Sequence, residues 1–331
     1  MNTKIETIAS FVPKKKVTNK QIEEKIAKSF PEIPFWILEE MTWVKTRYFV
    51  EDWVFASSLA INASKICFKN SQIKKEKIDL LIFASASQDI IEPATGNIIQ
   101  KELWLKCPIF DVKNACNSFL NWLEIADSFI KSWKYKNILV CSWETPSKVI
   151  KYDVKNRLEF KKHFASYTFW DAWIATILTA NEEDCWIKKT FFSSDWNFWE
   201  LWTIMWWGSR FPHKDMNYFT WEPWALRDKF RSVWISDFEK WLEELWWRKE
   251  DIKKIFVHQV AMSNFDYIQE ILQIEKEKFE IILPDYWNIA SCCIFLSFDK
   301  FSKKNILKKW DKLVFMWFAS WYSYWFIFYE V

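Results

Sequence analysis

The chain has 331 residues, half of them hydrophobic, and its 46 Lys and Arg against 43 Asp and Glu give a formal net charge of +3. This length is enough for one large core or two moderate ones, and the balanced charge excludes the basic stripe that nucleic-acid binding needs. No apolar run reaches the length of a membrane span, and residues 1–16 lack the charge order of a secretory signal, so we expect a cytoplasmic protein with no membrane span.

Three segments of the first half of the chain recur in the second half, in the same order and at a nearly constant spacing. The pairs are KIDLLIFASAS (77–87) with DIKKIFVHQVA (251–261), IFDVKNAC (109–116) with ILPDYWNIA (282–290), and KNILVCSW (136–143) with DKLVFMW (311–317). In each half the predicted order is helix, strand, strand–turn–helix and strand, which is typical of mixed sheets covered by helices. The repeat predicts two similar α/β halves, residues 1–175 and 176–331.

A helix is predicted to begin near Cys116. Apolar residues recur at the spacing of one helix face directly after the segment DVKNAC, at Phe119, Leu123, Ala126 and Ile130. Cys116 therefore lies at a strand-to-helix turn, where the helix dipole and free backbone N–H groups favour a thiolate. This makes Cys116 a candidate nucleophile, and a small buried hydrophobic residue is the alternative.

Two further polar residues follow predicted strands of the second half. His258 ends the apolar segment KIFVHQ, and Asn288 follows the next segment, at the turn that corresponds to that of Cys116. The duplicated topology can bring all three residues to one cleft at the strand ends. The alternative for His258 is a histidine of the core, and His163 and His213 are predicted to be surface or loop residues.

The cysteines and histidines do not form a metal-binding pattern. Seven cysteines contain no CxxC pair, and only three histidines are present. We therefore expect no disulfide framework and no metal site, and one reactive thiol among several inert buried ones. The cysteines are Cys67, Cys107, Cys116, Cys141, Cys185, Cys292 and Cys293.

The counts of glycine and tryptophan are abnormal, at 2 and 26. An average protein of this length has roughly 23 glycines. Many tryptophans stand at strand ends or turns, where glycine is expected: Trp43, Trp143, Trp173, Trp207, Trp287, Trp317, Trp321 and Trp325. Because some bacteria read the UGA codon as glycine where the usual table gives tryptophan, we interpret most of these residues as glycine in the native protein; Trp36 can be genuine. The alternative is a Trp-rich, non-enzymatic binding protein with indoles as stacking platforms.

Several segments resemble one enzyme family. DVKNACNSF is similar to the nucleophile segment of the β-ketoacyl-acyl-carrier-protein synthase III family of thiolase-fold condensing enzymes, and VHQVA, YWNIAS and FWDAWIA resemble its other signature segments. The similarity runs in collinear order from about Thr42 to the C-terminus, and glycine in place of tryptophan (YGNIAS, FGDAGIA, GFASGYSYG) brings each segment closer. The resemblance implies a thiolase-like fold, with two duplicated α/β halves in a layered α-β-α-β-α sandwich.

The same resemblance implies the reaction and its residues. Cys116 is then the acyl acceptor, His258 and Asn288 act on the malonyl unit, and the backbone N–H groups of Cys116 and Ser320 form the oxyanion hole. The implied reaction is the decarboxylative Claisen condensation of fatty acid biosynthesis, in which an acyl thioester such as acyl-CoA and malonyl-ACP give a 3-oxoacyl product. It also implies no bound cofactor, acyl carrier protein as partner, and a homodimer.

Two departures from the family pattern affect the segment after His258. Ala261 stands where the family has asparagine, and Ser263 where it often has arginine, so docking of a phosphate or of the carrier protein there is in question. A thiolase-fold protein whose catalysis has decayed is a further alternative. If glycine is the native residue, the indoles of the printed sequence should strain turns or fill the active-site cleft.

Overall fold

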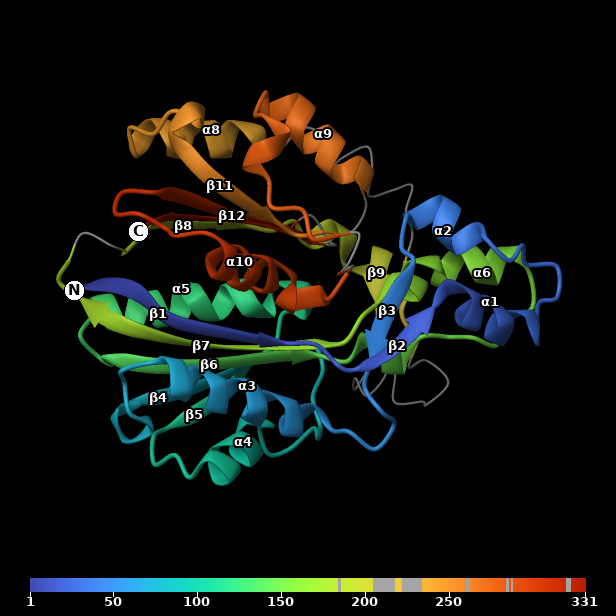
Figure 1. Ribbon diagram of the computed structural model, residues 1–331, viewed down its shortest axis with the longest axis horizontal. Helices are drawn as coiled ribbons and strands as arrows, with labels where there is room; N and C mark the ends of the chain where they lie inside the picture. The colour runs from blue at the N-terminus through green and yellow to red at the C-terminus, as the bar shows by residue number, and fades with distance from the viewer. Residues whose placement is uncertain are drawn as a thin grey trace.

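The structure, a computed structural model, describes residues 1–183, 186–204, 218–221, 234–259, 262–283, 286, 288–319 and 323–331. Helices and two main sheets alternate in five layers (Figure 1). This arrangement confirms the predicted thiolase-like α/β fold, with two duplicated halves in a layered α-β-α-β-α sandwich. The division of the chain between residues 175 and 176 stays a prediction.

The first sheet has five strands in the order β1-β7-β6-β4-β5. β7 pairs antiparallel with both of its neighbours, whereas β6, β4 and β5 are parallel to one another. The strands are β1 (Asn2–Phe11), β4 (Leu80–Ala84), β5 (Ile109–Val112), β6 (Asn137–Glu144) and β7 (Ala172–Asn181). Because β4 and most of β6 are covered on both faces, their side chains are buried and their sequences read as continuous apolar runs.

The second sheet repeats this topology in the order β8-β13-β12-β11. β13 is antiparallel to both neighbours and β12 is parallel to β11, and a parallel bridge from Ile255 to Phe279 marks the place of a fifth strand. The strand pairing repeats as well, since Val140 pairs with Ile82 and Phe315 with Phe256. Val140 of β6 thus corresponds to Phe315 of β12, which is the register that the repeated segments predict. The strands are β8 (Trp186–Ser193), β11 (Ile252–Val257), β12 (Lys312–Ala319) and β13 (Ser323–Glu330).

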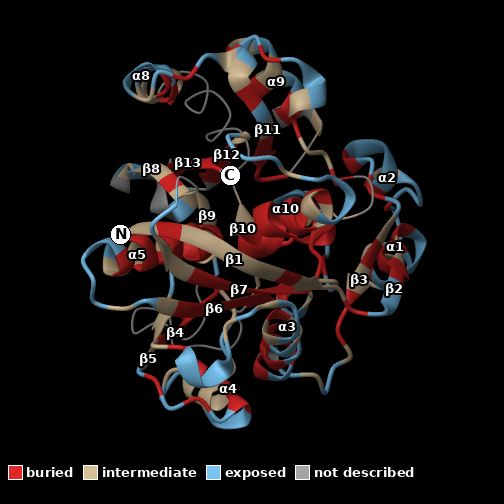
Figure 2. Cartoon of the chain, turned by 60° about the vertical axis from the view of Figure 1, so that its left-hand side comes forward, coloured by how far each residue is buried: buried red, intermediate tan, exposed pale blue. Residues whose placement is uncertain are grey.

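Two helices form the central layer between the sheets, α5 (Ser118–Lys131) and α10 (Cys293–Lys304) (Figure 1). The predicted face of α5 is confirmed, because its four apolar residues are all buried. α10 is buried along most of its length, as its red ribbon shows (Figure 2). α3 (Ala56–Asn70) and α4 (Gly96–Leu103) cover the outer face of the first sheet, and α8 (Ile235–Glu244) and α9 (Met262–Leu272) that of the second.

A smaller group of elements lies at one side of the layers, on the right of Figure 1. It has its own apolar core, and α1 begins with a capping box in which Thr18 and Gln21 exchange hydrogen bonds. The group comprises β2 (Lys15–Thr18), α1 (Asn19–Ala27), α2 (Ile37–Thr42), β3 (Thr46–Phe49), α6 (Arg157–His163), β9 (Trp202–Thr203) and β10 (Thr220–Trp221). Short 3₁₀ helices are η1 (Lys75–Lys77), η2 (Ala115–Asn117), η3 (Pro146–Val149), η4 (Phe164–Thr168), η5 (Trp196–Leu201), η7 (Lys249–Asp251), η8 (Lys276–Lys278) and η9 (Ala290–Cys292).

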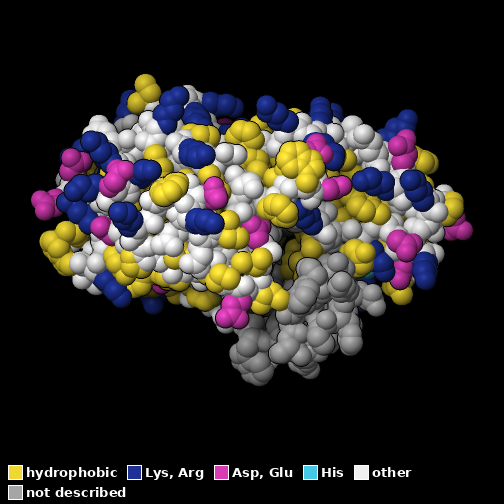
Figure 3. Space-filling model, turned by 90° about the horizontal axis from the view of Figure 1, so that it is seen from below, with side chains coloured by type: hydrophobic (Ala, Val, Ile, Leu, Met, Phe, Trp, Pro, Cys, Tyr) yellow, Lys and Arg dark blue, Asp and Glu magenta, His cyan; other side chains and the backbone are white. Residues whose placement is uncertain are grey.

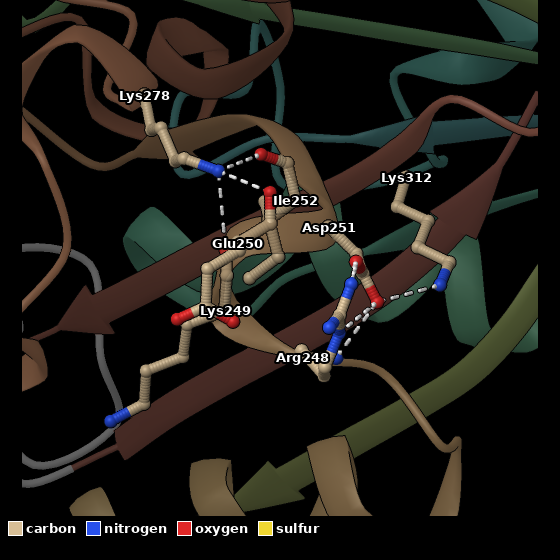
Figure 4. A network of polar contacts seen from close by, with 7 residues as sticks. All are labelled: Arg248, Lys249, Glu250, Asp251, Ile252, Lys278 and Lys312. Atoms are coloured by element: carbon tan, nitrogen blue, oxygen red, sulfur yellow. Dashed lines mark hydrogen bonds and ion pairs between the residues drawn. The ribbon is translucent and has the colours of Figure 1, made fainter.

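A polar network holds the beginning of β11 (Figure 4). The Lys278 ammonium donates to the carbonyl oxygens of Lys249 at 3.3 Å, Glu250 at 2.6 Å and Ile252 at 2.9 Å. The adjacent Asp251 carboxylate accepts from the Arg248 guanidinium at 2.8 Å. Because these contacts fix one end of β11, they also help to fix the strand whose other end leads to His258.

The surface mixes residue types on the face seen from below. Lysines, arginines, carboxylates and apolar side chains are interspersed there, without a continuous basic stripe on the part of this face that is described (Figure 3). None of the helices in the described ranges combines the length and apolar character that crossing a membrane needs.

Candidate active site

Cys116 lies in the turn that joins β5 to α5. The turn is the 3₁₀ helix η2, and Ala115 at its start has a left-handed φ of 44°. The Ser118 hydroxyl holds the turn, because it accepts from the Asn114 N–H at 2.9 Å and donates to the Ala115 carbonyl at 2.6 Å. The predicted strand-to-helix position of Cys116 is confirmed, and its side chain is nearly buried, with 9% exposed.

Asn288 precedes the equivalent turn of the second half. There η9 leads into α10, and Ala290 has a φ of 43°, as Ala115 has in the first half. Since the two alanines correspond, the counterpart of Cys116 is Ser291, and Asn288 lies slightly earlier in the same turn. The side-chain oxygen of Asn288 accepts from the Ala290 N–H at 3.0 Å, which leaves its Nδ2 amide as the donor of that side chain.

His258 follows β11 and contacts β12. Its backbone N–H donates to the Met316 carbonyl oxygen at 3.0 Å. Its ring stacks on that of Trp317, with centroids 4.0 Å apart and planes inclined by 9°. Burial lowers the pKa of His258 to about 3, so its imidazole is neutral at physiological pH. Among the described residues its Nδ1 has no hydrogen-bond partner.

Contacts between the turns bring these residues to one region. η2, which carries Cys116, contacts η9 and β12, and the His258 ring stacks on Trp317 of β12. These contacts bring together the elements that carry or adjoin the three residues, and the meeting of the three side chains at one cleft stays a prediction. Ser320 lies outside the described residues, as do Ala261, Trp287 and His213, and so does the side chain of Ser263.

The protonation of Cys116 differs from the prediction. Burial raises the pKa of its thiol to about 12, and the nearby Glu144 charge acts in the same direction. The expected thiolate is therefore wrong for this structure, because the loss of water around the sulfur outweighs the field of the helix terminus. Nucleophilic attack needs a route by which solvent and substrate reach this sulfur.

Glu144, which the sequence interpretation did not single out, joins the two halves at the end of β6. Its buried carboxylate accepts from the Ala86 N–H at 2.9 Å, the Ser87 hydroxyl at 2.9 Å and the Ser291 hydroxyl. Burial raises the pKa of Glu144 to about 7, although these donors lower it. The contact with Ser291 holds the turn that Asn288 precedes. A charged residue that ends an apolar strand, in VCSWE, is the signal that could have found it.

Asp171 of the segment FWDAWIA has a supporting position. Its buried carboxylate accepts from the Val50 N–H at 2.8 Å and from the Ser147 N–H and hydroxyl at 3.1 and 2.6 Å. It thus connects the loops that precede β7 and follow β3. The prediction of a surface or loop position is wrong for His163, because it is the last residue of α6 and is buried, with its Nδ1 2.7 Å from the Phe219 carbonyl oxygen. Within the described ranges, no three His, Cys, Asp or Glu side chains group as metal ligands.

Family models and curated relatives match this chain. Residues 110–195 match the model for 3-oxoacyl-[acyl-carrier-protein (ACP)] synthase III, and residues 242–327 match that for its C-terminal domain. A β-ketoacyl-[acyl-carrier-protein] synthase III of Clostridium novyi is 30% identical over 335 residues, covering 96% of either chain. The enzyme of the same name from Fusobacterium nucleatum is 27% identical, covering 97% of this chain and 96% of its own.

Solved structures share the fold. Xanthomonas campestris OleA, crystallised with lauric acid and lauroyl-CoA, superposes with a TM-score of 0.89 at 21% identity, over 100% of this chain and 99% of its own. The 3-oxoacyl-[acyl-carrier-protein] synthase III of Aquifex aeolicus gives a TM-score of 0.84 at 24% identity, over 99% of this chain and 100% of its own.

Proposed function

Since the chain belongs to the 3-oxoacyl-[acyl-carrier-protein] synthase III family and is thus a condensing enzyme of the acyltransferase class, we propose that it works through an acyl-enzyme at Cys116. The substrates are an acyl thioester, with acyl-CoA as the starter, and malonyl-ACP. The observation that supports this proposal is the contact of η2, which carries Cys116, with η9, which follows Asn288, and with β12, whose Trp317 ring stacks on His258.

The first step is acyl transfer. The Cys116 sulfur attacks the thioester carbonyl, the carbon–sulfur bond to coenzyme A breaks, and the proton of the thiol ends on the released coenzyme A. Backbone N–H groups of Cys116 and Ser320 stabilise the oxyanion that forms on the way. The left-handed Ala115 supports this assignment, because it turns the chain sharply just before the nucleophile.

The second step is decarboxylation and carbon–carbon bond formation. Malonyl-ACP loses CO₂, and His258 and the Asn288 amide donate hydrogen bonds to the enolate oxygen that develops. The neutral state of His258 and the fixed side-chain oxygen of Asn288 support these roles, because both leave an N–H group to donate. The enolate carbon then attacks the acyl-cysteine and the carbon–sulfur bond to Cys116 breaks, which gives the 3-oxoacyl product and a thiolate that takes a proton from solvent to restore the thiol.

The setting of the reaction is proposed from the family alone. We place the enzyme in the cytoplasm, in fatty acid biosynthesis, as a homodimer that receives malonyl units from acyl carrier protein and binds no cofactor. Size measurement of the native protein by light scattering tests the dimer.

Two groups of variants test the residue roles. Cys116→Ala should lose acyl transfer from acyl-CoA, measured by the mass of the intact protein, whereas Cys107→Ala, which removes another buried thiol, should keep it. His258→Ala and Asn288→Ala should still form the acyl-enzyme and lose condensation with malonyl-ACP. Condensation by Cys116→Ala would rule out the proposed mechanism.

A further inference from the structure

We infer that position 317 is glycine in the native protein, and that the space filled by its indole is the route by which an acyl thioester reaches Cys116. The second statement rests on the proposed function. In the structure the Trp317 ring is fully buried against His258, and η2, which carries Cys116, contacts the same strand. Cys116, His258 and Asn288 are left with 9%, 5% and 1% of their surfaces exposed, which is too little for a substrate to reach them.

The internal repeat gives an independent reason for a small residue at 317. In the register that aligns β6 with β12, Trp317 corresponds to Ser142, as Cys116 corresponds to Ser291 in the turns. In the first half, Ser142 is small enough for the facing turn to approach, and its hydroxyl lies 3.0 Å from that of Ser291. The second half has an indole where the same approach by Cys116 needs a small residue. Glycine at 317 restores the geometry that the other half shows.

Other tryptophans in the core share one property with Trp317, a buried indole N–H with no hydrogen-bond acceptor among the described residues. Buried tryptophans normally find such an acceptor. Trp143 of β6 and Trp173 of β7 are cross-strand neighbours, and so are Trp317 of β12 and Trp325 of β13. Glycine at such positions would allow close approach of the backbones. The buried positions that we assign to glycine are 122, 143, 170, 173, 317 and 325.

A second set of tryptophans has a left-handed backbone conformation, which glycine adopts most easily. Eight non-glycine residues of the described chain have a left-handed φ, and five of them are tryptophan. After α4, the Trp104 N–H bonds to the Lys101 carbonyl and the next N–H to that of Gln100, which is the hydrogen-bond pattern of a helix end that normally uses glycine. Trp133 and Trp246 end α5 and α8 in the same way. The helix-end set, with φ between 55° and 64°, is Trp43, Trp104, Trp133 and Trp246, and the fifth residue, Trp310, with a φ of 74°, lies in the turn before β12.

The indoles of the helix-end set are largely exposed, so packing within the described part of the chain does not explain them. Between 67% and 90% of the surface of each residue is exposed. The left-handed backbone disfavours any side chain with a Cβ, so an exposed indole there has a cost without a compensating contact. A codon that the host reads as glycine and the usual table reads as tryptophan accounts for both sets at once.

Tryptic mass mapping of the protein purified from its own host tests the assignment. The peptide 102–106 (ELWLK) reports helix-end position 104, 137–148 (NILVCSWETPSK) reports buried position 143, and the C-terminal peptide 313–331 reports position 317. We expect glycine at all three. Tryptophan at 317 would overturn the inference, and tryptophan at 143 or 104 would overturn the assignment of glycine to the buried or the helix-end set.

The same digest separates this inference from the proposed function. The protein is first incubated with an acyl-CoA, and peptide 114–131, which contains Cys116, is examined for an added acyl group. Glycine at 317 with an acylated Cys116 supports both statements of the inference. Glycine at 317 with an unmodified Cys116 overturns the substrate route and counts against the proposed acyl-enzyme, while the glycine assignment stands. Tryptophan at 317 with an acylated Cys116 overturns the inference and leaves the proposed function intact.

Discussion

The turns that contain Cys116 and Ser291 have the same backbone and different surroundings. Both pass through an alanine with a left-handed φ, of 44° and 43°, and both lead into a buried central helix. Ser291 is held by polar contacts to the first sheet, since its hydroxyl meets Ser142 and donates to Glu144. The repeat places Trp317 and Ala319 at the positions of the second sheet that correspond to Ser142 and Glu144, so the counterpart of Glu144 is not a carboxylate.

The difference shows how the two halves of a duplicated fold can take different roles. The turn of the second half is held by the hydrogen bond from Ser291 to the buried Glu144, and Asn288 bonds to the same turn. The other turn has a thiol at the same place, and it lacks the carboxylate that would fasten it. Under the proposed function, the structural role of the turn belongs to Ser291 in one half and the chemical role to Cys116 in the other.

Exchange of the two equivalent residues for alanine should give the largest contrast. Cys116→Ala should reduce acyl-enzyme formation to background, because the nucleophile is gone. Ser291→Ala should keep activity within about 30-fold, because it removes two hydrogen bonds, to Ser142 and Glu144, each worth roughly 1 kcal/mol. The rate of acyl transfer from acyl-CoA is the measurement. Equal losses in the two variants would mean that the turns do not differ in role.

The free energy of unfolding should depend on pH through the buried Glu144 carboxyl, which holds the Ser291 turn. Its pKa is raised from 4.5 to about 7 by burial, so the folded state holds a proton that the unfolded state has already released in this interval. The contribution of Glu144 to the free energy of unfolding is complete below about pH 4.5, falls as the pH rises, and is lost above about pH 7. Integrated over the interval, the loss is on the order of 3 kcal/mol in the free energy of unfolding.

Urea unfolding of the wild type and Glu144→Gln at several pH values measures this loss. The difference between the two proteins should change with pH between 4.5 and 7.5, because the amide does not titrate, while all other groups cancel. Glu159→Gln is the control, since it removes an exposed carboxylate whose pKa is lowered and should not abolish the fall. Parallel curves for wild type and Glu144→Gln would show that Glu144 does not hold the extra proton.

Replacement of Trp317 should make the second turn resemble the first. Trp317→Ser copies Ser142, and Trp317→Gly copies the inferred native residue. Either change admits water to Cys116 and lowers its raised pKa, so alkylation by iodoacetamide at pH 8 should be at least about 10-fold faster. Trp310→Gly, in an exposed turn, is the matched control and should leave the rate unchanged. No acceleration in either folded variant would mean that the indole does not block the sulfur.

The duplicated topology and the position of Cys116 could be predicted from the sequence because they rest on periodic apolar patterns. The face of α5 and the repeat of β4, β6, β11 and β12 follow from residues whose spacing alone determines their burial. The sequence predicted the turn near Asn288 that corresponds to the Cys116 turn. That Ser291 is the residue equivalent to Cys116 became clear only from the backbone of the two turns. Cys116 also shows the limit of local reasoning, because its pKa depends on what covers it and not only on its helix.

Contacts between the halves could not be predicted. Glu144 bonds to Ser291, which is far away in the sequence, and no local pattern indicates which distant hydroxyl a strand-end carboxylate will meet. His163 was misplaced for the same reason: its neighbours in the sequence are lysines, whereas its partner, Phe219, comes from a distant strand connection. The roles of Cys116, His258, Asn288 and Ser320 stay predictions.

The smallest expected effects come from the helix ends, where the printed residue and the backbone disagree. Trp104→Gly, Trp133→Gly and Trp246→Gly should each raise the free energy of unfolding by about 1 kcal/mol, because glycine adopts the left-handed φ without steric cost. Trp36→Gly is the control: this residue is also exposed, at 62%, but its φ of −164° is open to any residue. It should bring no gain in urea unfolding. If Trp36→Gly stabilised the protein as much as Trp104→Gly, removal of an exposed indole, and not the backbone, would be the cause, and the helix ends would no longer support glycine.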